Sequence, residues 1–333
     1  MATCLFPVSQ ALRGHHGDDQ APTDLVDYAQ LDAFTSEPFR GNPAAVCLLP
    51  IARSKEWMQN VAAEFSAPMT AFLVKRTSSF ANGTSNGEDA PNGHSTAGEL
   101  HAISEEKASE FDVRFFTPMA EVDLCGHATL ASAYLMFKSN LAPGTHVFFH
   151  TSSATLKVNK LRGEDGNNEW QGQVELSLPF MDSSPASIDT PSVFPQTLKS
   201  SKAISAHNSI WDRLILELPC AADVETLAPC FQEIAQCGMD GGVIVTAKGT
   251  AASPFDFVSR FFAPQLGIPE DPVCGTAHCA LAPFWAAKLG KKKLLAYQAS
   301  KRGGVLELCV DEDARRVLLR GTAVIVSTGV LLS

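Results

Sequence analysis

Hydrophobic and polar residues alternate along much of this chain, and that pattern predicts strands more often than helices. Residues 28–34 and 44–49 alternate on either side of a Gly-Asn-Pro turn and are expected to form two strands. Within 55–65, apolar residues recur every four positions, which predicts an amphipathic helix. Residues 70–74 are again strand-like. The pattern therefore predicts a strand-rich protein with few helices.

Two segments lack any such pattern. Residues 1–27 mix His, Gly and Asp without periodicity, and residues 77–110 are rich in Ser, Asn, Gly and Glu with almost no large apolar side chains. Neither segment can bury enough apolar surface to offset the entropy cost of ordering. We expect a disordered lead and a flexible insertion.

A Leu-Ala-Pro-Gly stretch at 141–144 is interpreted as a domain boundary. We predict an N-terminal lobe over 28–145 and a C-terminal lobe over 146–333, and leave open whether the last strand returns to the N-terminal lobe. Residues 224–237 are expected to form a helix of the second lobe. The fold class is α+β, with one helix per half packed inside its sheet.

The clearest signal in the chain is an internal repeat. Residues 114–118 read Arg-Phe-Phe-Thr-Pro and lead to Cys125-Gly126 and an apolar helix. Residues 260–264 read Arg-Phe-Phe-Ala-Pro and lead to Cys274-Gly275 and another apolar helix. Two homologous half-molecules that face each other would bring two thiols and two helix N-termini into one small volume.

Each Cys-Gly turn is a candidate ligand site. The helix N-terminus supplies unpaired N–H groups and partial positive charge, and glycine lets the backbone approach a bound carboxylate. The same field favours a thiolate at Cys125, although Glu121 and Asp123 oppose that effect. In the second copy Asp271 precedes the thiol by three residues, and Thr276 can cap the helix or hydrogen-bond a ligand.

Composition narrows the function classes. A net charge of -10 argues against a nucleic-acid partner, and no apolar run is long enough to span a membrane. Nine cysteines without an N-terminal signal sequence predict free thiols in the cytoplasm. The cysteines and histidines lack zinc-ligand spacing, and the Gly-rich fingerprints of dinucleotide and phosphate sites are absent from the sequence.

Several motifs together resemble one family. They are Asp-Ala-Phe-Thr at 32–35, Phe-Arg-Gly-Asn-Pro-Ala-Ala-Val at 39–46, Leu-Cys-Gly-His-Ala-Thr-Leu-Ala at 124–131, Glu-Asp-Pro-Val-Cys-Gly-Thr-Ala-His at 270–278 and Gln-Ala-Ser-Lys-Arg-Gly-Gly at 298–304. This combination resembles the PhzF-like (phenazine biosynthesis-like) isomerases, relatives of diaminopimelate epimerase and proline racemase. The resemblance covers nearly all of residues 28–332.

The resemblance implies a diaminopimelate-epimerase-like fold, in which two lobes each wrap a curved sheet around a central helix. It also implies proton transfer on a small carboxylic acid in the cleft between the lobes, without metal or cofactor, in a protein that is often a homodimer. His127 and Asp271 would support the proton shuttle. The carboxylate would be held by Gly126, Gly275 and Thr276, and we add Asn42 and Met69 as substrate-binding positions.

One departure from the family affects the chemistry. The family's proton-shuttling glutamate lies in an Asn-Leu-Ser-Glu-Thr-Ala-Phe stretch, which aligns with residues 66–72 and places Met69 at the position of the base. A methionine cannot carry a proton. Glu64, five residues earlier on the predicted helix, is expected to point elsewhere.

Three hypotheses follow. In the first, the Cys125 and Cys274 thiols carry general acid–base catalysis at a carbon centre. In the second, His127 and Asp271 transfer the proton. In the third, the protein lost its base and survives as a ligand-binding or scaffold protein, with Met69 filling the cleft.

Overall fold

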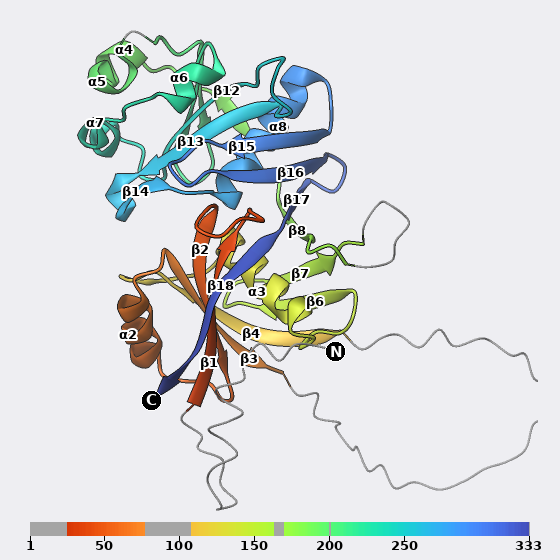
Figure 1. Ribbon diagram of the computed structural model, residues 1–333. Helices are drawn as coiled ribbons and strands as arrows, with labels where there is room; N and C mark the ends of the chain where they lie inside the picture. Colours follow the sequence, from red (N-terminus) through yellow and green to blue (C-terminus); the bar gives the residue numbers. More distant parts are fainter. Residues whose placement is uncertain (1–24, 77–107, 163–169, 200, 333) are drawn as a thin grey trace, which may run out of the picture.

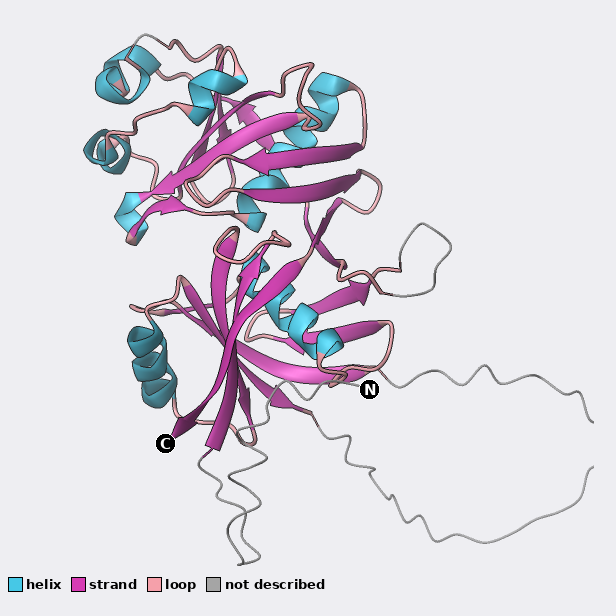
Figure 2. Ribbon diagram, viewed as in Figure 1, coloured by secondary structure: helices cyan, strands magenta, loops and turns pink. Residues whose placement is uncertain are grey.

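A computed structural model describes residues 25–76, 108–162, 170–199 and 201–332. The chain forms two lobes stacked on each other, one holding the N-terminal strands and the other most of the second half (Figure 1). Strands make up most of both lobes, and one long helix lies inside each (Figure 2). The predicted α+β class is therefore confirmed.

The N-terminal lobe contains eight strands and two helices before the chain crosses to the other lobe. They are β1 (Leu25–Ala33), β2 (Asn42–Leu49), α2 (Lys55–Phe65), β3 (Met69–Lys75), β4 (Ser109–Phe116), β5 (Glu121–Val122), α3 (Gly126–Lys138), β6 (His146–His150), β7 (Thr155–Lys160) and β8 (Val174–Pro179). β1 and β2 are antiparallel, β2 and β3 parallel, and β3 and β4 antiparallel. β4 also pairs in parallel with β6, which continues antiparallel into β7 and β8.

The C-terminal lobe repeats this arrangement. Its elements are β9 (Ser183–Pro185), α4 (Thr190–Val193), α5 (Pro195–Leu198), β10 (Ser205–Ser209), β11 (Arg213–Glu217), α6 (Ala221–Glu225), α7 (Phe231–Gln236), β12 (Gly242–Lys248), β13 (Phe257–Ala263), the 3-10 helix η1 (Pro264–Leu266), β14 (Ile268–Asp271), α8 (Gly275–Leu289), β15 (Lys293–Gln298), β16 (Gly304–Asp311) and β17 (Arg316–Gly321). The last strand, β18 (Ala323–Leu332), lies in the N-terminal lobe (Figure 1). β10 to β13 pair antiparallel, parallel and antiparallel in turn, as β1 to β4 do. β13 pairs in parallel with β15, as β4 does with β6.

The predicted lobe boundary at residue 145 is wrong. β6, β7 and β8 join the sheet of β4, so the N-terminal lobe continues to Pro179. The Leu-Ala-Pro-Gly stretch is the loop between α3 and β6 inside that lobe. The pairing of β8 with β17 connects the two sheets, and the last strand, β18, returns to pair with β1.

Three other sequence expectations shift. The helix expected over 224–237 is interrupted, because α6 ends at Glu225 and α7 begins only at Phe231, after Pro229. β1 begins at Leu25 and β4 at Ser109, so each strand takes in the last residues of the expected lead and insertion. Residues 1–24 and 77–107 of those segments lie outside the described residues. Among the described residues, no helix is long and apolar enough to cross a bilayer.

The long helices α3 and α8 form the centres of the two lobes. Nearly every residue of α3 is buried, including polar ones, and most of α8 is buried as well. A helix that is apolar on all sides needs cover on all sides. The curved sheet of each lobe supplies that cover, and it fixes where each helix begins.

Candidate active site

The two enclosed helices begin at the same place between the lobes. α3 starts at Gly126 directly after Cys125, and α8 starts at Gly275 directly after Cys274. A Cβ atom added to Gly126 would lie 3.7 Å from the Cα atom of Gly275, so the two turns touch across the lobe boundary. The structure therefore brings together the two Cys-Gly turns that the sequence repeat singles out. Two positively polarised helix ends meet there.

On the N-terminal side, Cys125 and His127 form a buried pair. Cys125 Sγ lies 3.3 Å from His127 Nδ1, and the two residues are only 6% and 7% exposed. Burial raises the pKa of the Cys125 thiol well above its usual range, although hydrogen bonds from the first N–H groups of α3 oppose this. Burial lowers the pKa of His127 to about 4, against a hydrogen bond to the Pro43 carbonyl. Near neutral pH the thiol is protonated and the imidazole is uncharged.

On the C-terminal side, Asp271 and Cys274 carry the titrating groups. Burial is the main cause that raises the pKa of Asp271 to about 6, opposed by a backbone hydrogen bond from Val273 and by the charge of Arg213. Burial raises the pKa of Cys274 to about 11. The Cys274 Sγ atom lies 3.3 Å from Thr276 Oγ1. Asp271 is thus the group of this cluster whose pKa lies nearest neutral pH.

Asn42 links the two lobes at this point. Its Nδ2 atom donates to Asp271 Oδ1 at 2.9 Å and to the Val273 carbonyl at 3.0 Å. Its Oδ1 atom is buried and has no hydrogen-bond partner in the described structure. Gln298 secures the same turn, because it accepts a hydrogen bond from Cys274 N at 2.8 Å and donates to the Asp271 carbonyl at 2.6 Å.

Met69 is the first residue of β3 and pairs with Ala44 of β2. It is 7% exposed and belongs to the same apolar cluster as Cys125 and Cys274. At Met69, which the resemblance aligns with the family's base, the structure has a buried apolar side chain. Glu64 is exposed on α2 and does not substitute for it.

Sequence reasoning missed two residues near the candidate site. Gln298 stabilises the turn between Asp271 and Cys274 by hydrogen bonds, and Arg213 brings a positive charge. Gln298 lies in a motif that the family resemblance quotes, so its position was visible but its role was not. Arg213 Nη2 donates to Thr276 Oγ1 at 3.1 Å. No local motif marks Arg213, because it reaches the site only through the pairing of β11 with β12.

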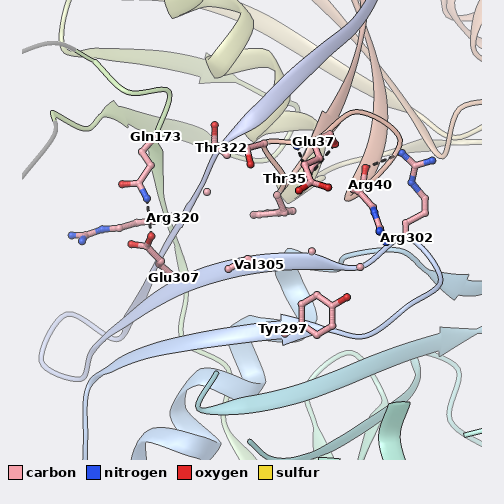
Figure 3. A pocket seen from close by; sticks show the side chains of 15 residues that line it. Thr35, Glu37, Arg40, Gln173, Tyr297, Arg302, Val305, Glu307, Arg320 and Thr322 are labelled. Carbon is pink, nitrogen blue, oxygen red and sulfur yellow. Dashed lines mark hydrogen bonds between the residues drawn. The ribbon is translucent and has the colours of Figure 1, made fainter. Parts of the chain in front are cut away.

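A separate cavity of about 360 Å³ lies where β16 and the β17–β18 connection pass between the lobes. Some of its polar side chains are already hydrogen-bonded: Gln173 donates to Glu307 within the lining, and Arg302 donates to Asp32 and to the Gly41 carbonyl outside it. Figure 3 shows Glu307, Gln173 and Arg320 at one end and Arg302 with Arg40 at the other. Neither Cys-Gly turn lines this cavity.

Comparison with known proteins agrees with this architecture. The family model "Phenazine biosynthesis-like protein" matches residues 31–329. A protein named as an uncharacterized isomerase of Halalkalibacterium halodurans is 38% identical over 306 residues, which cover 91% of this chain and 97% of that protein. The crystal structure of a PhzF-family protein from Enterococcus faecalis superposes with a TM-score of 0.74 at 32% identity, over 92% of this chain and 99% of that one.

A more distant likeness concerns the fold alone. A hydroxyproline epimerase from Agrobacterium vitis, solved with trans-4-hydroxy-L-proline bound, superposes with a TM-score of 0.52 at 12% identity, over 92% of each chain. The epimerase-like architecture that the sequence resemblance implies is thereby confirmed. The chain belongs to the PhzF-like, phenazine biosynthesis-like family of isomerases.

Proposed function

We propose that this protein is an isomerase that moves a proton at a carbon centre of a small carboxylic acid, with Asp271 as the base. The observation that carries the proposal is the partly buried Asp271 carboxyl, whose pKa of about 6 suits a proton acceptor near neutral pH. Burial is the main cause of the raised pKa of both thiols, and the charge of Asp271 raises the pKa of each further, which supports a position of Asp271 near Cys125 as well as Cys274. The carboxylate thus takes the role that Met69 cannot.

The thiols are better suited to donate a proton than to accept one. A raised thiol pKa means that the protonated form dominates at neutral pH, and this holds for Cys125 and Cys274 alike. We assign the donor role to Cys125, because it approaches from the opposite lobe and His127 orients it at 3.3 Å. In this scheme Asp271 takes the proton from one face of the carbon and Cys125 returns one to the other face. The helix field at α3 stabilises the resulting thiolate.

The substrate carboxylate has its binding groups at the helix starts. Gly126 and Gly275 are the first residues of α3 and α8, and Thr276 follows Gly275 at the start of α8. Such N-termini bind carboxylates through their unpaired N–H groups and positive dipole ends. The proposal needs no group beyond these side chains and backbone amides.

The test is exchange of a carbon-bound hydrogen for deuterium. Small acids, including trans-4-hydroxy-L-proline and a dihydro-hydroxyanthranilate, are incubated with the protein in D₂O and followed by proton NMR. Loss of a carbon-bound proton signal in the wild type, absent in Asp271→Asn, is expected. Exchange that is unchanged in Asp271→Asn would refute the role of Asp271 as base.

The second candidate function is that of a ligand-binding protein without turnover. It is supported by the apolar Met69 at the position of the family's base and by two protonated thiols. Acids that bind without exchange, as seen by ligand-observed NMR, would favour this reading. Exchange that appears only in Met69→Glu would favour it further.

A further inference from the structure

Arg213 lies beside the C-terminal half of the site. Its Nη2 atom donates to Thr276 Oγ1 at 3.1 Å, and Thr276 Oγ1 lies 3.3 Å from Cys274 Sγ. Two polar contacts therefore lead from the guanidinium to the thiol, at the first turn of α8. A fixed positive charge stands next to the positively polarised helix end.

Two nitrogen atoms of Arg213 lack an acceptor. Nε and Nη1 are buried and have no hydrogen-bond partner in the described part of the chain. The guanidinium carbon lies 5.2 Å from the ring centre of Trp211 and 4.9 Å from that of Phe261. Ring faces attract a cation but are weak acceptors for its N–H groups. A buried N–H group of a charged side chain destabilises the protein when it has no acceptor. An anion bound beside Arg213 would supply the acceptors that are missing.

Arg260 shows how the same lobe treats a buried structural arginine. Its Nε and Nη2 atoms donate to the carboxylate of Glu270 at 2.7 and 3.0 Å, and Nη1 donates to the Leu227 carbonyl at 2.6 Å. It also lies over a ring, that of Phe262, at 5.0 Å. Stacking on a ring therefore accompanies full hydrogen bonding there. At Arg213 only the stacking and one hydrogen bond are present.

The nearest carboxyl group does not supply the missing acceptor. Asp271 acts on Arg213 electrostatically, but its Oδ1 atom accepts from Asn42 at 2.9 Å, and within the described ranges it forms no ion pair with Arg213. The acceptor that completes Arg213 must come from outside the chain's own carboxylates. A ligand anion beside Thr276 fits this requirement.

Arg213 is also held in place before any ligand arrives. It follows a turn in which Trp211 and Asp212 have φ values of 60° and 56°, in the left-handed region. The Asp212 carbonyl accepts from Gly241 N at 3.0 Å, and a Cβ on Gly241 would lie 1.7 Å from the Trp211 carbonyl oxygen. Only glycine permits that approach. Backbone strain of this kind persists where surrounding contacts impose it, and it recurs at ligand-binding positions.

We propose that Arg213 binds the carboxylate of the substrate and makes the site selective for small organic acids whose anionic group lies beside Cys274. A carboxylate at this position accepts from the guanidinium and from the N-terminus of α8, a charge-assisted arrangement stronger than either contact alone. The inference refines the proposed function by naming the group that recognises the acid. It does not require that the acid be turned over.

The test uses the neighbouring thiol as a reporter. Cys274 is alkylated at pH 8.5 with anionic iodoacetate or with uncharged iodoacetamide, the thiolate displacing iodide in both cases, and each rate is read by peptide mass spectrometry. The exposed thiol of Cys220 is the reference in the same chain, and free N-acetylcysteine corrects for the repulsion of iodoacetate by Asp223, whose Oδ2 atom lies 3.3 Å from Cys220 Sγ. In the wild type the iodoacetate-to-iodoacetamide ratio should be higher at Cys274 than at Cys220 by about tenfold or more.

Variants of Arg213 decide the outcome. Arg213→Met should reduce the ratio at Cys274 to that at Cys220, and Arg213→Lys should retain part of the preference. Arg76→Met removes the same charge from an exposed arginine on the far edge of β3 and should change nothing. Because the ratio compares two reagents at one thiol, a change in the pKa of Cys274 cancels from it.

Two results would overturn the proposal. One is a wild-type Cys274 that iodoacetate does not label, whatever iodoacetamide does. The other is a preference for iodoacetate that survives in Arg213→Met.

A purely structural role of Arg213 makes a different prediction. Arg213→Met would then lower the midpoint of thermal unfolding, whereas loss of an unpaired buried charge should leave that midpoint unchanged or raise it. Alkylation by iodoacetate does not involve Asp271 as a base, so a failed exchange assay leaves this test intact.

Discussion

The two halves of the molecule share a scaffold and differ in their chemistry. In each half an arginine within a long strand binds a glutamate bidentately: Arg114 to Glu121 at 2.7 and 2.9 Å, and Arg260 to Glu270 at 2.7 and 3.0 Å. Each guanidinium also lies over the second phenylalanine of its motif, at 5.3 and 5.0 Å. The contacts that shape the Cys-Gly turn are therefore duplicated in detail.

The residues that face the site are not duplicated. The N-terminal half presents Cys125 with a neutral histidine, whereas the C-terminal half presents Cys274 with a threonine, a carboxyl group and an arginine. Titratable charge is concentrated in one lobe. A repeated scaffold thus fixes where two helix ends meet, and the side chains around that point differ between the lobes. Under the proposed function, this difference assigns proton removal to the C-terminal lobe and proton return to the N-terminal lobe.

The largest expected effect is on the charged half. Asp271→Asn should lower the deuterium exchange rate by about 10³-fold, within the range of general-base catalysis. It should also stabilise the protein, because the folded pKa of about 6 lies above the unfolded value of 3.8. The native carboxyl contributes full stability below pH 4 and loses it as pH rises through 6, so the variant gains roughly 2 kcal/mol above pH 6. Chemical denaturation of the wild type and the variant at pH 5 and pH 7.5 measures this gain. A difference in unfolding free energy between the two proteins that is the same at both pH values would contradict the raised pKa of Asp271.

The duplicated ion pairs should differ in strength. Arg260 and Glu270 are only 10% and 19% exposed at their side chains, whereas Arg114 is 40% exposed. Arg260→Met removes a buried arginine and leaves the partly buried Glu270 carboxylate without its partner, which should cost about 3 kcal/mol of unfolding free energy. Arg114→Met should cost under about 1 kcal/mol of unfolding free energy, because Glu121 keeps its ion pair with Lys55 and its contact with water. If both variants lost the same unfolding free energy in urea denaturation, the two ion pairs would be equally strong.

The two thiols should also respond unequally. Cys125→Ser removes the proposed proton donor and should slow exchange by about 10²-fold, since general acid catalysis contributes on that scale. Cys274→Ser keeps a hydroxyl beside Thr276 and should slow exchange by less than about tenfold. The two variants serve as controls for each other under one assay. A larger loss for Cys274→Ser would reverse the assignment of donor.

The smallest effect concerns acid stability of the N-terminal half. The folded pKa of His127 is about 4, below the unfolded value of 6.5, so the unfolded chain binds the proton more readily. Stability from this residue is complete above pH 6.5 and is lost as pH falls toward 4. His127→Asn should reduce the loss between pH 7 and pH 5 by about 1 to 2 kcal/mol. His278, also buried with a pKa of about 4, remains in the variant and accounts for the residual loss.

Sequence patterns predicted the features that depend on local order. Helix α2 has the bounds that its apolar residues, spaced four positions apart, predict. The Arg-Phe-Phe repeat predicted that the two Cys-Gly turns meet. The lobe boundary failed because alternation in β6 and β7 identifies strands but not the sheet that they join. That choice is made by the parallel pairing of β6 with β4, a contact between strands that helix α3 separates in the sequence.

The site divides in the same way. Asp271, Cys125, Cys274 and His127 could be proposed from the sequence because they lie within two short motifs. Arg213 was missed because its role rests on two distant neighbours, Phe261 on β13 and Thr276 on α8. The residues next to Arg213 in the sequence do not reveal that its side chain contacts the Phe261 ring and the Thr276 hydroxyl group.

The return of β18 to β1 gives the N-terminal lobe an unusual dependence on the end of the chain. During synthesis β1 is made early, yet its second neighbour emerges only after the whole C-terminal lobe. Until then one long edge of the first sheet is open to pairing with other chains, which is a known route to aggregation. Loss of the last ten residues of the sheet would therefore be felt at the opposite end of the sequence, as misassembly of the lobe that is translated first.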